Sequence, residues 1–384
     1  MLYFRSGSHA CRLFTVLSVV GELPNSAIHM LGNERVCKAM ISKMLTSQTI
    51  HNSQIDMEMT CRLLTMGGKG SGKFVRLYKA ALPILDWVHP DALRYYMSAF
   101  RNHTFSGDMA HRERNFRVPE TVAMCMNAGI EFRPYILPKL QNREMLRVIP
   151  ESTSLYLSKD IKRVGEFETN KTQFTRMAGA IFTADKCYAV YNTRNSVMKW
   201  HGQGEYKALI SLTEISRLNA GIFDIDSAIL FGESDTVALN TIEESEQNKR
   251  KAFRFDATYH NIHFVPMNAD GVRLLRILTI PNFNAKLMDL LFEPEERSYN
   301  RGRFEYDAYI NGVYVLSHLD SDIAKLIRFN DAVSAQSVKA EILCYPYQVD
   351  FIREYTDRHV SIKTIDMDLV ESELGLEMGG KNIG

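Results

Sequence analysis

The sequence predicts an α+β protein with a winged helix-turn-helix domain at residues 1–105 and an α/β domain of mixed sheet at residues 106–370. A flexible tail, first acidic and then glycine-rich, is expected at residues 371–384. Two patterns lead to this fold class. Three helical patterns and then a pair of strand-like runs lie within the first 80 residues, and strands alternate with helices from residue 130 onward. The length of 384 residues suits two domains.

The composition is that of a soluble globular protein, with 45% hydrophobic and 24% charged residues. The six cysteines are scattered and form no CxxC pair, which argues against a zinc ribbon or a disulfide framework. No apolar run approaches the roughly 20 residues that span a bilayer. We therefore expect a cytoplasmic protein with reduced thiols, no membrane contact, no cofactor and no bound metal.

The net charge of +1 conceals an asymmetry along the chain. Residues 1–117 contain 15 Lys and Arg against 8 Asp and Glu, whereas the remainder is net acidic. A basic front half indicates a polyanion partner, and double-stranded DNA is the partner we expect. Chance clustering on a solvated face is the alternative.

Three helices are expected at the front of the chain. The first covers residues 8–20 and ends where Gly21 and Pro24 break the pattern. A short second helix covers residues 25–31, and a third begins at the capping residue Asn33 and runs to about Thr46.

The third helix has two contrasting faces, as expected of a helix that enters the DNA major groove. Val36, Met40 and Met44 recur at helical spacing and are expected to face inward. The outer face is expected to bring Arg35, Lys38, Ser42 and Lys43, with Thr46, to phosphates and base edges.

A hairpin with a glycine-rich tip follows. Strand-like runs at Thr60–Met66 and Phe74–Tyr78 flank the loop Gly67–Lys73. The glycines would let the backbone approach DNA phosphates, which the basic side chains would neutralise. The residues expected to make these contacts are Lys69, Lys73 and Arg76.

The same loop nearly matches a nucleotide-binding P-loop, because Gly67 is followed after four residues by Gly72-Lys73. Phe74 stands where a Ser or Thr hydroxyl would hold Mg²⁺, and a strand pattern follows where a P-loop requires a helix. The sequence therefore favours a DNA-contacting wing over a nucleotide site.

The segment between the wing and the second domain is expected to be mainly helical. Helices are expected at residues 80–88, 90–100 and 109–128, the last kinked at Pro119, with an interdomain loop at residues 102–108. The pair Tyr95-Tyr96 could suggest a relaxase nucleophile, but its apolar neighbours favour simple packing.

The second domain is expected to be a mixed sheet with helices, and a restriction-endonuclease-like sheet is one form it could take. Asn311-Gly312 between two strand patterns is a strong hairpin signal. Strands are expected at residues 131–137, 154–158, 174–183, 186–193, 227–231, 263–267, 306–310, 313–317, 340–344 and 360–365. Helices are expected at residues 203–219, 235–246, 320–329 and 347–358, with another after the strand that ends at Met267.

No catalytic constellation stands out in this domain. Five carboxylates are available for a metal-dependent nuclease, but none has the PD-(D/E)-x-K spacing: Glu168, Glu205, Asp224, Asp226 and Asp307. His260 and His263 hint at metal ligation, although a structural role is favoured. The stretch Arg194–Trp200 could bind a ligand or nucleic acid, and Trp200 could equally be a core residue.

Several segments within the first 220 residues resemble the replication-relaxation family of bacterial plasmids and integrative conjugative elements. The segments that carry the resemblance are Leu13–Leu17, Arg76–Tyr78, His111–Asn115, Arg176–Ala180, Ala189–Asn192 and Lys199–Glu205. The resemblance implies a role in replication or copy control of a mobile element and a nuclease-like second domain. Because the acidic motif is not recognisable here, no catalytic residue is carried over.

Three functions remain open from the sequence. The favoured one is a DNA-binding replication or transcription regulator without catalysis, which could act as a homodimer and with replication or conjugation proteins. The second is a metal-dependent enzyme that nicks DNA at an element's origin. The third is a ligand-responsive or protein-interaction module.

Overall fold

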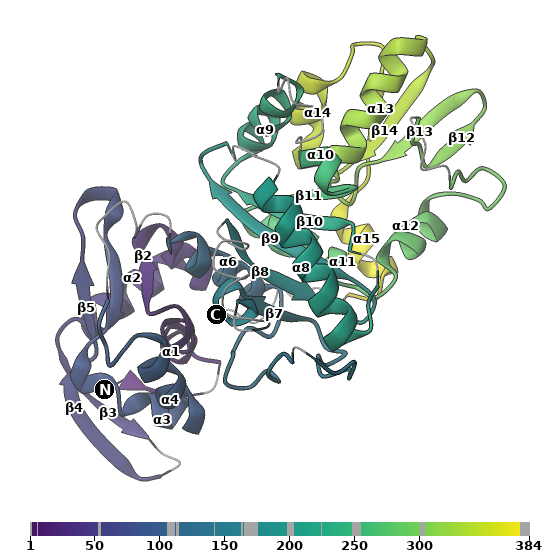
Figure 1. The fold of residues 1–384 in the computed structure, drawn as a ribbon. Coiled ribbons are helices and arrows are strands. Elements are labelled where there is room, and N and C mark those ends of the chain that lie inside the picture. Colours follow the sequence, from purple (N-terminus) through teal and green to yellow (C-terminus); the bar gives the residue numbers. More distant parts are fainter. Residues whose placement is uncertain are drawn as a thin grey trace. The chain divides into compact units, whose positions relative to one another are not determined.

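The computed structural model describes two compact units of mixed α and β structure (Figure 1). The first contains residues 1–139 with Ser154–Asp160, and the second contains Leu140–Thr153 and the chain from Ile161 onward. All residues are described except 1, 6, 53–54, 106–111, 113–114, 142, 163, 165–175, 198–202, 224, 248–254, 300–303 and 377–384. The first unit thus extends past residue 105, where the sequence placed the boundary.

The first helix, α1 (His9–Val20), forms the centre of the first unit. Ser8 caps it by accepting a hydrogen bond from the amide of Cys11. One face is fully buried, because apolar residues recur every three to four positions. Gly21 ends the helix with φ +77°, and a Cβ there would collide with the Phe100 ring.

Three elements follow α1 in the order that the sequence indicates. A short strand, β2 (Glu22–Pro24), leads into the 3₁₀ helix η1 (Asn25–Leu31) and then into α2 (Glu34–Met44). Asn33 caps α2, as expected, by accepting from the amide of Val36. The second helix is therefore present in tighter 3₁₀ form, and β2 is an element that the sequence pattern did not reveal.

The glycine-rich segment forms the expected hairpin. Strand β5 (Leu64–Gly67) pairs antiparallel with β6 (Phe74–Leu77), and β2 pairs with the other edge of β6. The resulting sheet has the order β2-β6-β5. Gly68 has φ +77°, and a Cβ there would lie 2.1 Å from the carbonyl oxygen of Gly72, so the tight turn requires glycine.

A second hairpin in this unit was not predicted. Strands β3 (Ser47–Asn52) and β4 (Met57–Arg62) pair antiparallel, and β1 (Leu2–Tyr3) completes the sheet β1-β3-β4. The expected strand at Thr60–Met66 is in fact two strands, because the backbone of Leu63 bonds with Met44 and Tyr78 instead of continuing either ladder. Most of β3 is polar, so the alternation that signals a strand is weak there.

Helices η3 (Lys79–Ala81), α3 (Ile84–Val88) and α4 (Pro90–Ala99) follow the hairpin. Tyr96 is fully buried, and its hydroxyl lies 2.9 Å from Nδ1 of His103, which confirms that this tyrosine packs. The loop expected between domains belongs to the first unit, since His103 also packs on Phe105. Residues 106–108 lie outside the described part.

Helix α6 (Arg117–Asn127) is shorter than the helix expected at residues 109–128, although residues 109–111 and 113–114 lie outside the described part. Pro119 causes no kink because it lies in the first turn, where its missing N–H has no helical partner to lose. The helix packs on η1 and β2. This packing extends the first unit beyond residue 105.

The prediction of a strand at Glu131–Leu137 is wrong. Glu131 accepts hydrogen bonds from the amides of Phe132 and Arg133, and this local turn bends the chain. Only an isolated bridge joins Glu131 to Ser154. The expected strand at residues 154–158 is present as β7 (Ser154–Leu157), followed by the helical turn α7 (Ser158–Ile161).

The first sheet of the second unit is built as the sequence predicts. Strands β8 (Met177–Phe182) and β9 (Cys187–Arg194) form a hairpin, and β10 (Ser227–Gly232) and β11 (Asn261–Pro266) continue parallel to β9. Their order is β11-β10-β9-β8. Connecting helices are α8 (Gln203–Ala220), α9 (Asp235–Gln247) and α10 (Phe255–Thr258).

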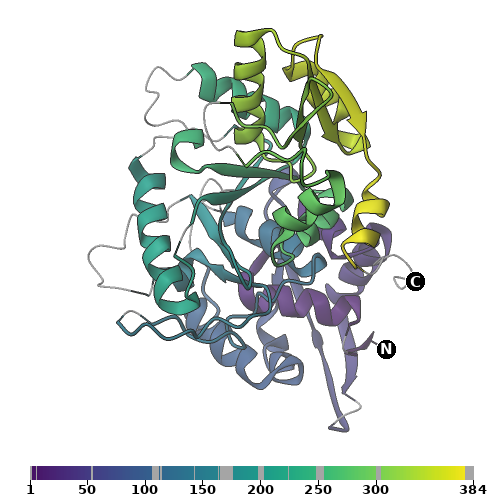
Figure 2. The same ribbon diagram turned by 90° about the vertical axis from the view of Figure 1, so that its right-hand side faces the viewer.

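The second sheet has the order β12-β13-β14-β15 (Figure 2, green to yellow). Its strands are β12 (Ala308–Ile310), β13 (Val313–Ser317), β14 (Ala340–Cys344) and β15 (Ser361–Thr364). The first pair is antiparallel and the other two pairs are parallel. Helices of this part are α11 (Ala269–Leu278), α12 (Phe283–Leu291), α13 (Ile323–Gln336), α14 (Val349–Tyr355) and α15 (Met367–Glu373), with the 3₁₀ turn η5 (Pro346–Gln348).

The two sheets of the second unit meet at the loop after β13. The amide of Phe264 in β11 donates to the carbonyl of Ser321, and His263 forms an isolated bridge with Asp322. The loop therefore covers the outer edge of β11 and brings the start of α13 beside the first sheet. A pocket opens beside this junction.

Candidate functional site

The outer face of α2 is exposed where the sequence predicts it. Its exposed residues include Arg35, Lys38, Ser42 and Lys43, and Thr46 is exposed just beyond the helix. Lys38 forms an ion pair with Glu34 at 2.6 Å, and both side chains are more than half exposed. The face is open to a large ligand, with one of its charges locally balanced.

The predicted inner face of α2 needs correction. Val36 is 49% exposed and Met40 is only partly buried. The buried stripe consists instead of Cys37, Ile41 and Met44. Met44 is buried as predicted, but Cys37 and Ile41 are buried in place of Val36 and Met40, each one residue later in the helix.

The three basic residues of the hairpin differ in their surroundings. Lys69 and Lys73 are exposed at the glycine-rich turn. Arg76 is only partly exposed, forms an ion pair with Glu22 at 3.4 Å and stacks on the Phe105 ring at 4.9 Å. Strand β6 follows Lys73, whereas a P-loop needs a helix at that position.

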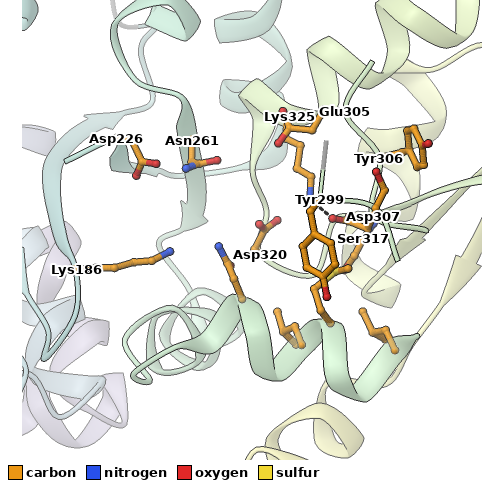
Figure 3. A pocket seen from close by; sticks show the side chains of 15 residues that line it. Lys186, Asp226, Asn261, Tyr299, Glu305, Tyr306, Asp307, Ser317, Asp320 and Lys325 are labelled. Atoms are coloured by element: carbon orange, nitrogen blue, oxygen red, sulfur yellow. Dashed lines mark hydrogen bonds and ion pairs between the residues drawn. The ribbon is translucent and has the colours of Figure 1, made fainter. Parts of the chain in front are cut away.

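The second unit contains a pocket of about 250 Å³ (Figure 3). Lining residues come from the beginnings of β9, β10 and β11, from α12, from the segment before β12, and from β13 and α13. Its charged and polar lining residues are Lys186, Asp226, Asn261, Asn284, Ser298, Tyr299, Glu305, Tyr306, Asp307, Ser317, Asp320 and Lys325, and its apolar ones are Leu287, Met288 and Leu291.

A buried ion pair fixes one wall of this pocket. Lys325 Nζ lies 2.6 Å from Asp307 Oδ1, and Asp307 Oδ2 accepts a hydrogen bond from the amide of Ser317 at 2.7 Å. Burial alone would lower the pKa of Lys325, but Asp307 and Asp320 outweigh it and raise that pKa. Lys325 is therefore held as a cation against β12.

A second ionic group lies next to this pair. Arg328 Nε donates to Glu305 Oε2 at 2.8 Å, and His260 Nε2 lies 3.6 Å from Glu305 Oε1. Burial raises the pKa of Glu305, but His260, Arg328 and Lys325 together hold it at about 2. Glu305 is thus a charged, fully engaged carboxylate.

Asp320 differs from these two carboxylates. Only 8% of it is exposed, and Oδ1 accepts a hydrogen bond from the amide of Asp322 at 3.1 Å. Among the described residues Oδ2 has no hydrogen-bond donor or ion-pair partner. In Figure 3 its side chain projects between Lys186, Asp226 and Asn261 on one side and the residues around Asp307 on the other.

The opposite wall comes from the amino ends of three parallel strands. Lys186, Asp226 and Asn261 precede or begin β9, β10 and β11. Asp226 Oδ1 accepts from the hydroxyl of Ser227 at 2.7 Å, and Lys186 Nζ lies 4.5 Å from the centre of the Phe283 ring. This wall therefore supplies one carboxylate, one amide and one ammonium group.

The carboxylates named from the sequence are only partly brought together. Asp226 and Asp307 line the same pocket, whereas Glu205 lies on α8 in an ion pair with Arg176 at 3.2 Å. Glu168, Asp224 and residues 198–200 of the stretch Arg194–Trp200 fall outside the described residues, and so does much of the basic stretch at residues 111–115. In the described part of the chain no group of three or more His, Cys, Asp or Glu side chains is arranged to hold a metal ion.

The two histidines singled out from the sequence have different positions. His263 is buried, with Nδ1 2.8 Å from the carbonyl oxygen of Asp320, while His260 is partly exposed beside Glu305. His263 thus holds the chain segment that carries Asp320. The sequence did not predict a site at Asp320, Glu305 or Lys325. A usable signal was present, because Asp320 closely follows the buried strand β13, and strand ends often carry binding residues.

The chain matches no family model, no curated protein and no solved structure. Across the described residues, no helix is both long enough and apolar enough to cross a membrane.

Proposed function

We propose that this chain is a DNA-binding protein whose first unit acts as a winged helix. In this proposal α2 enters the major groove and the β5–β6 hairpin lies along the phosphate backbone. The exposed face of α2, with Arg35, Lys38, Ser42 and Lys43 opposite its buried stripe, carries the proposal.

The arrangement of the elements supports it further. Helix α1, strand β2, the 3₁₀ helix η1 and helix α2 precede the β5–β6 hairpin, and β2 pairs with β6. A strand placed in this way fixes the hairpin relative to the two helices, as a wing requires. Lys69 and Lys73 are exposed at the hairpin turn, where they could neutralise phosphates.

A role in replication or copy control of a mobile element is part of the proposal and rests on the family resemblance alone. We propose this role without catalysis. The nicking alternative has weaker support, because Asp307 already binds Lys325 and the amide of Ser317 through its two oxygens. Such a carboxylate has few lone pairs left for a metal ion.

The test is a fourfold charge reversal, Lys38→Glu, Lys43→Glu, Lys69→Glu and Lys73→Glu, in the full chain. Affinity for a duplex DNA mixture is measured by fluorescence anisotropy at several salt concentrations. The unchanged protein is expected to lose affinity steeply with rising salt, by about 0.9 log units per log unit of salt for each phosphate neutralised. The variant is expected to lose binding.

A matched control reverses four exposed lysines of the second unit: Lys207, Lys286, Lys339 and Lys363. This control changes the net charge equally and is expected to keep most of the binding. Equal loss in both variants, or no loss in the first, would refute the assignment of α2 and the hairpin. Nicking of supercoiled plasmid in Mg²⁺ or Mn²⁺ would favour the enzyme instead.

A further inference from the structure

We propose that the pocket of the second unit binds a small organic cation, an alkylamine, with Asp320 as its main anchor. This site is separate from the basic surface of the first unit and does not depend on DNA binding. It would make the protein responsive to a metabolite that carries a protonated amine.

The charge around the pocket favours a cation. Its lining includes four carboxylates and two ammonium groups. Glu305 forms an ion pair with Arg328 and Asp307 with Lys325, whereas Asp320, which also acts electrostatically on Lys325, forms no ion pair among the described residues. A ligand that enters therefore meets net negative charge, which attracts cations and repels phosphate groups.

Asp320 supplies the specific recognition. A carboxylate that is more than nine-tenths buried is costly unless donors satisfy both oxygens. Asp320 lines the pocket; its Oδ1 has the amide of Asp322, and its Oδ2 has no donor among the described residues. An ammonium group would supply that donor as a charge-assisted hydrogen bond.

The remaining donors of an ammonium group also find acceptors. An ammonium has three N–H groups and needs several oxygens around it. The side-chain amides of Asn261 and Asn284 line the pocket and carry carbonyl oxygens. Asp226 lies on the same wall as Asn261 and adds to the negative charge of the pocket.

The third wall distinguishes an organic cation from a metal ion. Leu287, Met288 and Leu291 of α12 form an apolar surface in the pocket, which a hydrocarbon chain would cover. A hydrated divalent ion gains nothing from such a surface and prefers several oxygen ligands at once. The volume of about 250 Å³ admits a chain of a few carbon atoms.

The test measures binding of defined probes to the full chain by isothermal titration calorimetry. Butylamine, 1,4-diaminobutane and 1,5-diaminopentane are compared with butane-1,4-diol, magnesium chloride and inorganic phosphate. The amines are expected to bind with dissociation constants of about 1 mM or lower, and the diol, magnesium and phosphate are expected not to bind.

Two variants assign the binding to the pocket. Asp320→Asn keeps the acceptor for the Asp322 amide and removes the charge, and it is expected to weaken amine binding at least about tenfold. Asn284→Lys changes an exposed position of α12 and brings a competing ammonium to the pocket, so it should also abolish binding. Asp350→Asn alters a fully exposed carboxylate and serves as the control with unchanged binding.

Amines that fail to bind, or that bind Asp320→Asn and the unchanged protein equally, would overturn the proposal. Binding of magnesium or phosphate that Asp320→Asn abolishes would overturn it in favour of an ionic site. Thermal unfolding of each variant is recorded to confirm that it is folded. The two proposals fail separately, because the lysine reversals in the first unit leave this pocket unaltered.

Discussion

Lys325 and Asp307 form the most buried ion pair described around the pocket, and its role depends on both partners being present. Side-chain exposures are 14% and 10%, and the amide of Ser317 binds the second carboxylate oxygen. The pair therefore joins α13 to the beginning of β12 and to the end of β13. Losing one partner leaves a charge without compensation in the interior.

Lys325→Met is expected to lower the free energy of unfolding by about 3–5 kcal/mol, because Asp307 then remains buried and unpaired. The double variant Lys325→Met with Asp307→Asn should be more stable than the single one, since no lone charge is left. Urea unfolding followed by circular dichroism measures both. A double variant that is no more stable than Lys325→Met would show that the two groups are not coupled.

His318 makes stability depend on pH. It is 1% exposed, and its Nε2 has no hydrogen-bond partner among the described residues. Burial lowers its pKa to about 4, with Asp320 acting in the opposite direction and Lys325 and His263 adding to the effect. The folded protein thus keeps the ring neutral over a range in which the unfolded chain binds a proton.

We expect the contribution of His318 to be complete above pH 6.5 and to be lost as the pH falls towards 4. The loss approaches about 3 kcal/mol at the acid end, from the difference between 6.5 and about 4. His318→Phe should flatten this part of the curve. Unfolding free energies at several pH values test it, and parallel curves for the two proteins would contradict it.

Among the elements, the β12–β13 hairpin follows most directly from local sequence. Asn311 has φ 51° and Gly312 has φ 83°, the left-handed values of a type I′ turn. No heavy atom lies closer than 4.0 Å to a Cβ placed at Gly312. Its requirement for glycine is therefore conformational and not due to a steric clash with neighbours.

Gly312→Ala is expected to destabilise the protein by about 1–2 kcal/mol, the cost of a left-handed conformation for a residue with a Cβ. Asn311→Gly should be nearly neutral, because both residues tolerate that conformation. Thermal unfolding of the two variants gives the comparison. Similar melting temperatures would mean that the turn relaxes to another type.

Elements whose signals are local could be predicted from the sequence, while those that depend on distant partners could not. The strands β9, β10 and β14 are buried on both faces and appear as apolar runs in the sequence. The predicted bounds of α8 and α9 differ from the observed ones by one residue. By contrast, β3 is polar and exists because β4 pairs with it. The pocket was missed for the same reason, because Asp320 and Lys186 are far apart in sequence.

On the scale of the whole molecule, the first unit includes Ser154–Asp160, although the chain before this segment, Leu140–Thr153, belongs to the second unit. Lys159 donates to the carbonyl of Val19 at 2.9 Å and lies 5.0 Å from the ring centres of both Tyr95 and Phe100. The hydroxyl of Tyr156 donates to the carbonyl of Pro138. These contacts are internal to the first unit, so its stability depends on a segment beyond residue 139.

A fragment of residues 1–162 is therefore expected to melt several degrees above a fragment of residues 1–139, since about 1 kcal/mol moves the melting temperature of a domain this size by about 4 °C. Lys159→Ala should lower the melting temperature of the longer fragment part of the way towards that of the shorter one. Differential scanning calorimetry measures all three. Identical melting temperatures would show that β7 and α7 do not stabilise the unit.

The chain passes between the two units after residues 139, 153 and 160, and this has a genetic consequence. Neither unit is encoded by one uninterrupted stretch of the gene, so no single crossover can exchange one of them intact. A recombinant joined anywhere between residues 140 and 160 would combine incomplete parts of both. Descendants of this protein should therefore inherit the two units together, because loss of either unit would also require a new sequence at residues 140–160.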